Sequence, residues 1–198
     1  MDPGLEPGGD LEPARDLARA RAILEAYSPT SAAQAELRER FLEFVDAHPD
    51  AHRRELAAGH LTAGCLLVDR VRGRVLLNRH RKLGRWLQVG GHCDGDANLR
   101  GVAWRETLEE SGIEPTALSA HPVDLDLHVI PPFGGEGAHL HWDVRYLAEA
   151  PAGARERPSP ESLELAWFSF EEARRLEVDA SLRRLIDLAA PSRGAPTP

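Results

Sequence analysis

The stretch VGGHCDGDANLRGVAWRETLEESGI, residues 89–113, sets a glycine pair and two aspartates directly ahead of a glutamate-rich segment. Its second half predicts a helix from about Asn98 to Ser111. Asp96 or Asn98 suits the N-cap, because short polar side chains accept hydrogen bonds from the free amides there. Gly112 suits the C-terminal stop, where the backbone often turns left-handed. The stretch therefore predicts a glycine-containing loop that leads into a helix with defined ends.

Three carboxylates are concentrated on this helix. Positions three and four apart share a helix face, so Glu106, Glu109 and Glu110 are expected to project from one side. Carboxylates this close repel one another unless a cation lies among them or water screens them. The cluster therefore either binds a metal ion or forms a solvated surface.

The spacing of these residues resembles the Nudix box, which reads Gly, five residues, Glu, seven residues, Arg-Glu, an apolar residue, any residue, Glu-Glu, any residue, Gly, and an apolar residue. Gly91 fits the first glycine, and six later positions fit in register: Arg105, Glu106, Glu109, Glu110, Gly112 and Ile113. Two positions depart from the motif. Thr107 stands in the apolar position after Arg-Glu, and Ala97 stands where the motif has its first glutamate.

This resemblance implies a chemistry and a set of site residues. Nudix proteins are mostly Mg²⁺- or Mn²⁺-dependent hydrolases of a nucleoside diphosphate linked to another group, in which a metal-activated water attacks phosphorus. By the resemblance, Glu106, Glu109 and Glu110 are catalytic metal ligands, and the carbonyl of Gly90 adds another. Oxygen ligands of this kind suit hard divalent cations. Arg105 belongs to the catalytic set as a brace for the glutamates or the loop.

Two further expectations follow from the glycine pair and from the missing glutamate. Glycines let the backbone approach a metal ion and phosphates closely. Loss of the first glutamate leaves Arg105 short of a partner, and we expect Asp94 or Asp96 to take over that contact in an active enzyme. Introducing glutamate at Ala97 is then expected to compensate in part for loss of both aspartates. The rival hypothesis is a Nudix-fold module that binds or senses a nucleotide-like ligand without turnover.

The order of elements also resembles the Nudix fold, an α/β architecture with a mixed sheet sandwiched between helices. Strands are predicted in six segments, at 61–69, 73–80, 86–91, 123–130, 139–149 and 163–170, and residues 171–189 predict one or two helices. The resulting organisation has four parts: a disordered tail at 1–12, a helical extension at 13–59, a Nudix-type hydrolase domain at 60–190 and a second disordered tail at 191–198.

The helical extension carries apolar residues at helical spacing on two segments, with Leu17, Ala20, Ile23 and Leu24 on the first and Leu37, Phe41, Leu42 and Val45 on the second. An exposed apolar stripe of this length is rarely left in water. We expect the extension either to pack on the hydrolase domain or to form a homodimer contact.

Composition narrows the class of protein. The 198 residues have a formal net charge of −8, which argues against a general nucleic-acid or membrane surface as partner. The two cysteines, Cys65 and Cys93, form no CxxC pair and no disulfide framework, which suits a reducing cytoplasm. No segment has the roughly eighteen apolar residues of a membrane span. These features predict a soluble cytoplasmic protein, and the resemblance to the Nudix family implies that its partner is a small nucleotide-like diphosphate.

Residues outside the box supply candidates for substrate binding. His139, His141 and Asp143 alternate along a predicted strand and so face one side of it. They are predicted to contact substrate, as are three residues near the box, Lys82, Arg85 and His92. The alternative is a polar, solvent-facing strand and turn. Two histidines at this spacing are a weak zinc signal, and the sequence shows nothing that completes a structural zinc site.

The sequence leaves two further assignments open. A general base outside the box is expected among Glu136, Glu161 and Glu164. Three tryptophans, Trp86, Trp142 and Trp167, are expected to pack in the core or on the sheet, although one of them could instead stack on a nucleobase. The particular diphosphate substrate does not follow from the sequence.

Overall fold

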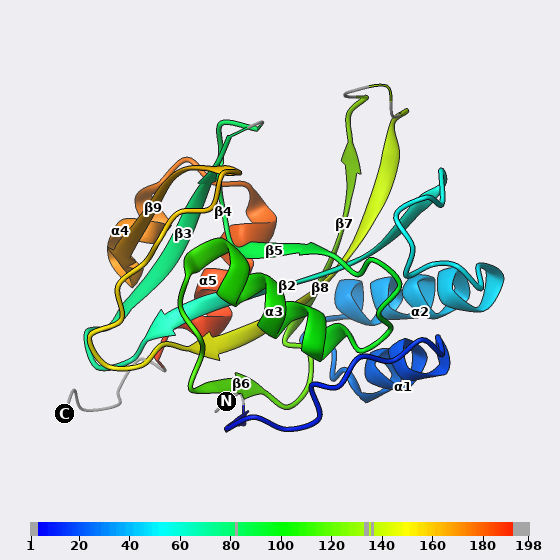
Figure 1. Ribbon diagram of the computed structural model, residues 1–198, viewed down its shortest axis with the longest axis horizontal. Coiled ribbons are helices and arrows are strands. Elements are labelled where there is room, and N and C mark those ends of the chain that lie inside the picture. Colours follow the sequence, from blue (N-terminus) through cyan, green and yellow to red (C-terminus); the bar gives the residue numbers. More distant parts are fainter. Residues whose placement is uncertain (1–3, 82, 133–134, 136, 192–198) are drawn as a thin grey trace.

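A computed structural model describes residues 4–81, 83–132, 135 and 137–191 of the chain (Figure 1). Its helices are α1 (Ala18–Ala26), α2 (Ala32–Ala47), α3 (Leu99–Ser111), α4 (Phe170–Arg175) and α5 (Ala180–Ala189). Its strands are β1 (Leu5–Glu6), β2 (Gly59–Asp69), β3 (Arg74–His80), β4 (Trp86–Leu87), β5 (Val89–His92), β6 (Ala117–Ser119), β7 (Asp124–Ile130), β8 (His139–Glu149) and β9 (Ser162–Ser169). Lys82 and Glu136 lie outside the described residues.

The long central strand β2 organises a mixed sheet. One edge of β2 pairs with β8 in parallel over nearly its whole length. The other edge is shared, because the first part of β2 pairs with β5 and the last part pairs with β3, both antiparallel. The far edge of β8 is shared in the same way between β7 and β6. The sheet therefore opens into two branches, one carrying β5 and the other carrying β3, β4 and β9.

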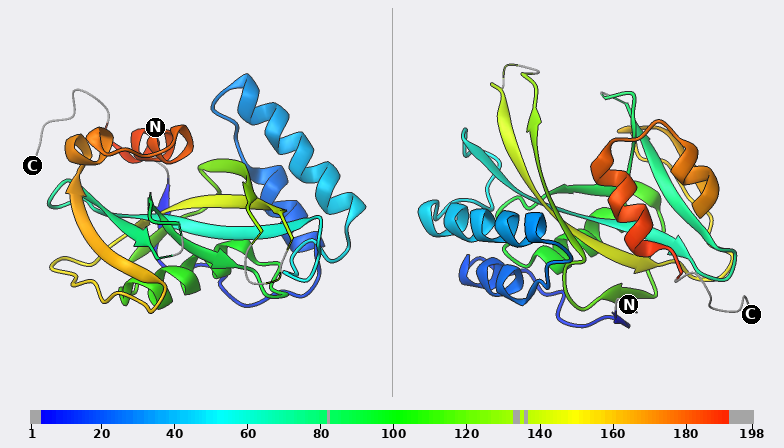
Figure 2. Two further views of the ribbon diagram at one scale, coloured as in Figure 1. Left: turned by 90° about the horizontal axis from the view of Figure 1, so that it is seen from above. Right: turned by 180° about the vertical axis from the view of Figure 1, so that it is seen from behind.

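Helices cover both faces of the sheet, as the mixed α/β prediction required (Figure 2). The α3 helix lies on one face, where Ala63, Cys65 and Leu67 of β2 join the larger apolar core. The α4 and α5 helices lie on the opposite face, where Leu66 and Val68 of β2 join a second core. Alternate residues of one strand thus supply two different cores, because successive side chains point to opposite faces.

The predicted helical extension forms α1 and α2 and packs on the domain. Phe44 of α2 stacks on Trp142 of β8 with ring centroids 4.2 Å apart, and Phe41 meets the same ring edge-on at 5.0 Å. Gln34 exchanges hydrogen bonds with the Leu125 backbone, donating at 3.0 Å and accepting at 3.2 Å. Of the two expected alternatives for the extension, packing on the hydrolase domain is the one that the structure shows.

The expectation of a disordered tail over residues 1–12 is wrong for residues 4–12. Leu5 and Glu6 form β1, which pairs with β6 at the edge of the sheet. The buried Arg100 then donates to the Gly8 carbonyl, and Asn98 donates to the carbonyls of Asp10 and Glu12. Two polar side chains of α3 and its N-cap thus supply long-range partners for this backbone, which the local proline- and glycine-rich sequence did not reveal.

Two predicted elements are divided in the structure. The strand expected at 86–91 breaks at Gln88, because β4 pairs with β3 while β5 pairs with β2. The C-terminal helical segment divides into α4 and α5, and Asp179 caps the second helix by accepting from the Leu182 N–H. Within the part of the chain that the structure describes, no helix is both long enough and apolar enough to span a bilayer.

Candidate active site

The helix predicted from the glutamate-rich stretch is α3, and its C-terminal end is formed as expected, whereas its N-cap residue, Asn98, makes no side-chain capping hydrogen bond. Asp96 accepts a hydrogen bond from the Asn98 N–H at 2.8 Å, just before the helix begins. Gly112 ends the helix in the left-handed conformation, with φ 67° and ψ 13°. Between these ends, α3 packs across β2 and β5, and the Cys65 thiol lies 3.5 Å from the Ala103 carbonyl. The helix is therefore fixed against the sheet at the point where the glycine pair lies.

The two glycines are each required by a different steric contact within the protein. A Cβ atom on Gly91 would lie 2.2 Å from Oε2 of Glu106. A Cβ atom on Gly90 would lie 2.6 Å from the Cα atom of Gly64, its partner on β2. Gly91 thus leaves room for a glutamate, whereas Gly90 lets two strands approach each other.

The three glutamates occupy different environments. Glu110 is 9% exposed and accepts a hydrogen bond from the Gly90 N–H at 2.9 Å. The side chain of Glu106 is 14% exposed, whereas that of Glu109 is 61% exposed. Among the residues that the structure describes, the three carboxylates do not bring one oxygen each within 4.8 Å of one another. In place of one cluster of three, Glu106 and Glu110 point inward beside the glycine pair and Glu109 lies at the surface.

Burial and mutual repulsion perturb the two inward carboxylates. Burial raises the pKa of Glu110 to about 7, and the charge of Glu106 adds to this shift. The Gly90 N–H and the side chain of Asn78 act in the opposite direction and favour the charged form. Burial likewise raises the pKa of Glu106, although its hydrogen bond with Arg105 opposes the shift. Each carboxylate is therefore costly to ionise here unless a positive charge is added nearby.

Arg105 braces the loop and the glutamates, as expected. It donates to the His92 carbonyl at 3.0 Å and to Oε1 of Glu106 at 3.1 Å, and it lies 3.9 Å from Glu109. Asp96 lies 3.8 Å from the same guanidinium, which makes it the nearby carboxylate that the missing motif glutamate led us to expect. Of the two aspartates considered, the contact found in the described residues is to Asp96.

The packing around position 97 explains why a small residue, Ala97, occupies it. It is fully buried, and its N–H donates to the Ala14 carbonyl. Asp96 also accepts from the Ala14 N–H at 2.9 Å, so this loop holds the N-terminal segment in place. A glutamate at position 97 would meet that segment. This packing argues against the expectation that Ala97→Glu restores what loss of the aspartates removes.

The predicted substrate residues separate into two groups. His92, His139 and His141 lie close together, since the His141 ring is 5.2 Å from each of the other two. Asp143 is 6% exposed and accepts from Thr62, Gln88 and Arg145 at 3.1, 3.0 and 2.8 Å. These internal contacts argue against direct binding of substrate by Asp143.

The β3–β4 turn supplies one described candidate for substrate binding. Arg85 is exposed, and its carbonyl accepts from the His80 N–H at 2.9 Å. Lys82 lies outside the described residues. The turn thus holds the Arg85 backbone in place and leaves its side chain at the surface.

Two of the proposed general bases can be placed. The charge of Glu161 raises the pKa of Glu110, and Glu161 itself is exposed just before β9. Glu164 is exposed on β9, opposite Arg79 of β3. Glu136 lies outside the described residues. Of the two described candidates, Glu161 is the one whose charge acts on Glu110.

Sequence reasoning missed three residues near the candidate site: Asn78, Gln88 and His60. Asn78 is buried on β3 beside Glu110, and Gln88 links β4 to Asp143. His60 of β2 is 3% exposed and lies against the histidines of β5 and β8. A strand that begins with a histidine carries no local signal of such contacts. The sheet pairing alone could have revealed them.

The tryptophans behave as packing residues. Trp142 lies in the larger core under α2, and Trp86 meets Phe168 edge-on with ring centroids 5.0 Å apart. Trp167 donates to Glu156 at 2.9 Å, and the guanidinium of Arg74 lies over its ring at 4.6 Å. The packing interpretation thus accounts for all three.

A family model described as the NUDIX domain matches residues 59–189. The chain belongs to the Nudix family. The fold also matches solved Nudix structures, among them an Ap4A hydrolase of C. elegans in a binary complex, with a TM-score of 0.53 and 21% identity over 65% of this chain and 93% of that chain. A Nudix-family hydrolase from Clostridium perfringens matches with a TM-score of 0.48 and 22% identity over 65% of this chain and 95% of that chain.

A third Nudix-fold structure, the E. coli dihydroneopterin triphosphate pyrophosphohydrolase, has a TM-score of 0.49 and 19% identity over 64% of this chain and 92% of that chain. No curated protein matches the chain. At its level of identity, the C. elegans structure with a TM-score of 0.53 shows a shared fold. The Nudix assignment of this chain rests on the family model, which extends from the start of β2 to the end of α5.

Proposed function

We propose that the protein is a metal-dependent hydrolase that cleaves the diphosphate linkage of a substrate in which a nucleoside diphosphate is joined to another group. The observation that carries this proposal is the pair of buried carboxylates, Glu106 and Glu110, held against Gly91 and Gly90. Buried carboxylates with raised pKa values are unfavourable in a structural role. A divalent cation would remove that penalty.

The donor set fits Mg²⁺ or Mn²⁺. Glu106 and Glu110 supply hard oxygen ligands from the buried side, and Glu109 can approach from the surface on its flexible side chain. Once bound, such an ion neutralises phosphate charge and lowers the pKa of a water molecule. Arg105 keeps Glu106 directed toward Gly91 and ties α3 to the β5 backbone through the His92 carbonyl. Its role is to position the ligands.

The substrate side of the site is proposed from the surrounding elements. Arg85 lies on the β3–β4 turn, where a cationic side chain can contact phosphate oxygens. Glu161, whose charge acts on Glu110, is proposed as the general base. The two free cysteines are both buried, and we propose that the enzyme acts in the reducing cytoplasm.

The test combines a substrate screen with a pair of matched variants. Sugar nucleotides, ADP-ribose, dinucleoside polyphosphates and oxidised nucleotides are incubated with the protein and either Mg²⁺ or Mn²⁺, and both products are recorded. On a confirmed substrate, Glu110→Gln is expected to lower turnover by about 10²-fold or more. Glu114→Gln, an exposed change just beyond α3, is the control and should leave turnover unchanged. Full activity of Glu110→Gln would remove this carboxylate from the site.

The absence of the first box glutamate supports one alternative, a Nudix-fold module that binds a nucleotide-like ligand without turnover. The two hypotheses separate in the same screen. Saturable binding of one compound, measured calorimetrically, with no product formed over many hours would establish the binding module. Product formation that requires the metal ion and Glu110 would exclude it.

A further inference from the structure

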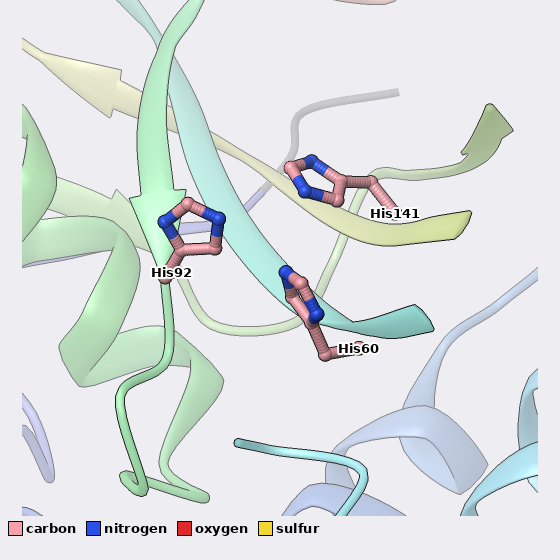
Figure 3. Close-up of side chains that lie close together, drawn as sticks. All are labelled: His60, His92 and His141. Carbon is pink, nitrogen blue, oxygen red and sulfur yellow. The ribbon is translucent and has the colours of Figure 1, made fainter. Parts of the chain in front are cut away.

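Three histidines from three different strands converge on the sheet face opposite α3. Figure 3 shows His60 of β2, His92 of β5 and His141 of β8 with their rings turned toward one another. One ring nitrogen from each lies within 4.8 Å of the others. The ring centroids are 5.0 Å apart for His60 and His92, 4.9 Å for His60 and His141, and 5.2 Å for His92 and His141.

The sheet fixes this arrangement. His60 and His141 are direct partners in the parallel pairing of β2 with β8. His92 lies opposite Thr62 on β5, which places its side chain on the face that His60 also occupies. All three histidines are thus carried by paired strands, which hold side chains more rigidly than loops do.

The cluster contains buried nitrogen atoms that need a partner. Among the described residues, neither ring nitrogen of His60 makes a hydrogen bond, and nor does the Nε2 atom of His141. The Leu56 backbone lies near enough to favour a protonated His60, yet it is outside hydrogen-bond geometry. His60 is 3% exposed, so water does not reach it freely. A buried polar group without a partner costs about 1–3 kcal/mol, which calls for an explanation.

The charge state of the rings suits ligation. Burial and the neighbouring histidines lower the pKa of His60 to about 4, and burial with the same neighbours also lowers the pKa of His141. A neutral imidazole has a lone pair to offer to a metal ion. Asp126 is paired with Arg145 and His128, and Asp143 is engaged by Thr62 and Gln88, so neither aspartate competes for the cluster.

We propose that His60, His92 and His141 bind a divalent transition-metal ion, with Zn²⁺ as the preferred occupant, and leave a fourth position open to a water molecule. Three imidazoles with one open position form a recognised Zn²⁺ arrangement, whereas Mg²⁺ prefers oxygen ligands. His139 lies at the rim, 5.1 Å from His60 by ring centroid, and its Nδ1 is engaged by the Gly137 carbonyl.

The site is separate from the box glutamates but adjoins them along β5. The missing Cβ of Gly91 would point at Glu106, whereas the next side chain, His92, points to the other face of the sheet. The His92 carbonyl accepts from Arg105. An ion on the histidines would therefore fix the strand whose backbone holds the box, and this inference does not require the proposed hydrolase activity.

Zinc binding by the untagged, full-length, metal-stripped protein tests the proposal. Zn²⁺ is titrated into the protein in a calorimeter in the presence of excess Mg²⁺, which occupies oxygen-ligand sites. In a separate measurement, the visible absorption spectrum of bound Co²⁺ reports whether nitrogen atoms coordinate the ion. One equivalent of Zn²⁺ is expected to bind and to raise the melting temperature. His60→Gln and His141→Gln are expected to weaken binding about tenfold or more. The controls are Glu110→Gln and His121→Gln, an exposed histidine outside the cluster, and both should bind as the parent does.

Three outcomes would overturn the assignment. They are absence of stoichiometric Zn²⁺ binding, parent-like affinity in His141→Gln, and loss of binding in Glu110→Gln alone, which would place the ion among the glutamates. If His60→Gln does not fold, His141→Gln decides, because His141 is only half-buried. A parent-like melting curve for that variant without Zn²⁺, together with loss of the zinc-induced shift, separates ligation from a general packing role.

Discussion

The two glycines before α3 should respond differently to the same added methyl group. In Gly91→Ala, the new Cβ would lie 2.2 Å from Oε2 and 2.7 Å from Cδ of Glu106. In Gly90→Ala, the new Cβ would lie 2.6 Å from the Cα atom of Gly64 and 2.9 Å from the Ala63 carbonyl oxygen. Neither glycine has a φ angle in the left-handed region, so steric contact alone sets the cost of each change.

The magnitudes follow from what must move. In Gly91→Ala the obstacle is the end of a flexible side chain, so Glu106 can turn away and lose its 3.1 Å hydrogen bond to Arg105. Because the Arg105 side chain is 36% exposed, this loss should lower the free energy of unfolding by about 1 kcal/mol or less. In Gly90→Ala the obstacle is the backbone of β2, which cannot turn away, and overpacking of this kind costs about 1–3 kcal/mol.

Gly91→Ala should lose less stability than Gly90→Ala but more catalytic activity. If Glu106 holds the catalytic ion, Gly91→Ala should lower kcat/KM by about 10²-fold or more while the protein remains nearly as stable as the parent. Urea denaturation followed by circular dichroism measures stability, and Mn²⁺ titration followed by electron paramagnetic resonance measures ion binding. Gly137→Ala is the matched control, because its Cβ would meet nothing within 4 Å. Parent-like activity and Mn²⁺ affinity in Gly91→Ala would refute the role proposed for Glu106.

Three further predictions concern the N-terminal segment and the buried ion pairs. Asp96→Ala removes hydrogen bonds to two backbone amides at 2.9 and 2.8 Å and should lower the free energy of unfolding, measured in urea, by about 1–2 kcal/mol. Adding Ala97→Glu places a carboxylate at a fully buried position and should lower the free energy of unfolding further. A higher free energy of unfolding in the double variant would contradict the packing of Ala97 against the N-terminal segment. Deletion of residues 1–59 removes Phe41 and Phe44 from the core, and truncating one buried aromatic side chain typically costs about 3–5 kcal/mol. The deletion should lower the melting temperature by about 10 °C or more, so an unchanged temperature would make the extension dispensable. Burial alone would raise the pKa of Asp126, but a hydrogen-bonded histidine and the charge of Arg145 outweigh burial and hold that pKa below its ordinary value of 3.8. Such a carboxylate stabilises the fold above about pH 4 and loses its contribution as the pH falls through the folded-state value, so the stability gap between the parent and Asp126→Asn should be widest near neutral pH and should narrow in acid.

Local sequence determined the helix at the centre of the proposed site. Asp96 accepts from the Asn98 N–H just before the helix, and Gly112 ends the helix; both are local features that a linear pattern can reveal. The positions of most strands followed from alternation and turn residues for the same reason, whereas the short strands β1 and β6 were not predicted. The spacing of the glutamates also indicated the family before any three-dimensional contact was known, because the motif lies in one continuous stretch.

Tertiary structure decided what the individual residues contact. Glu106 and Glu109 look alike in the sequence, yet only Glu106 is directed inward, because Gly91 leaves space for it on β5. Residues 4–12 look like a tail, yet polar side chains of α3 and its N-cap pair with their backbone.

The histidine cluster was the feature furthest from the reach of sequence reasoning. His141 suggested contact with substrate or a polar strand surface, with only a weak zinc signal, and His60 carried no signal near the start of an apolar strand. Their contact depends on the parallel register of β2 with β8, and that of His92 depends on the separate pairing of β5 with β2. Parallel pairing joins segments distant in the chain, and its register is set by packing of both faces of the sheet. No local pattern in either strand records which residue of the other will lie beside it.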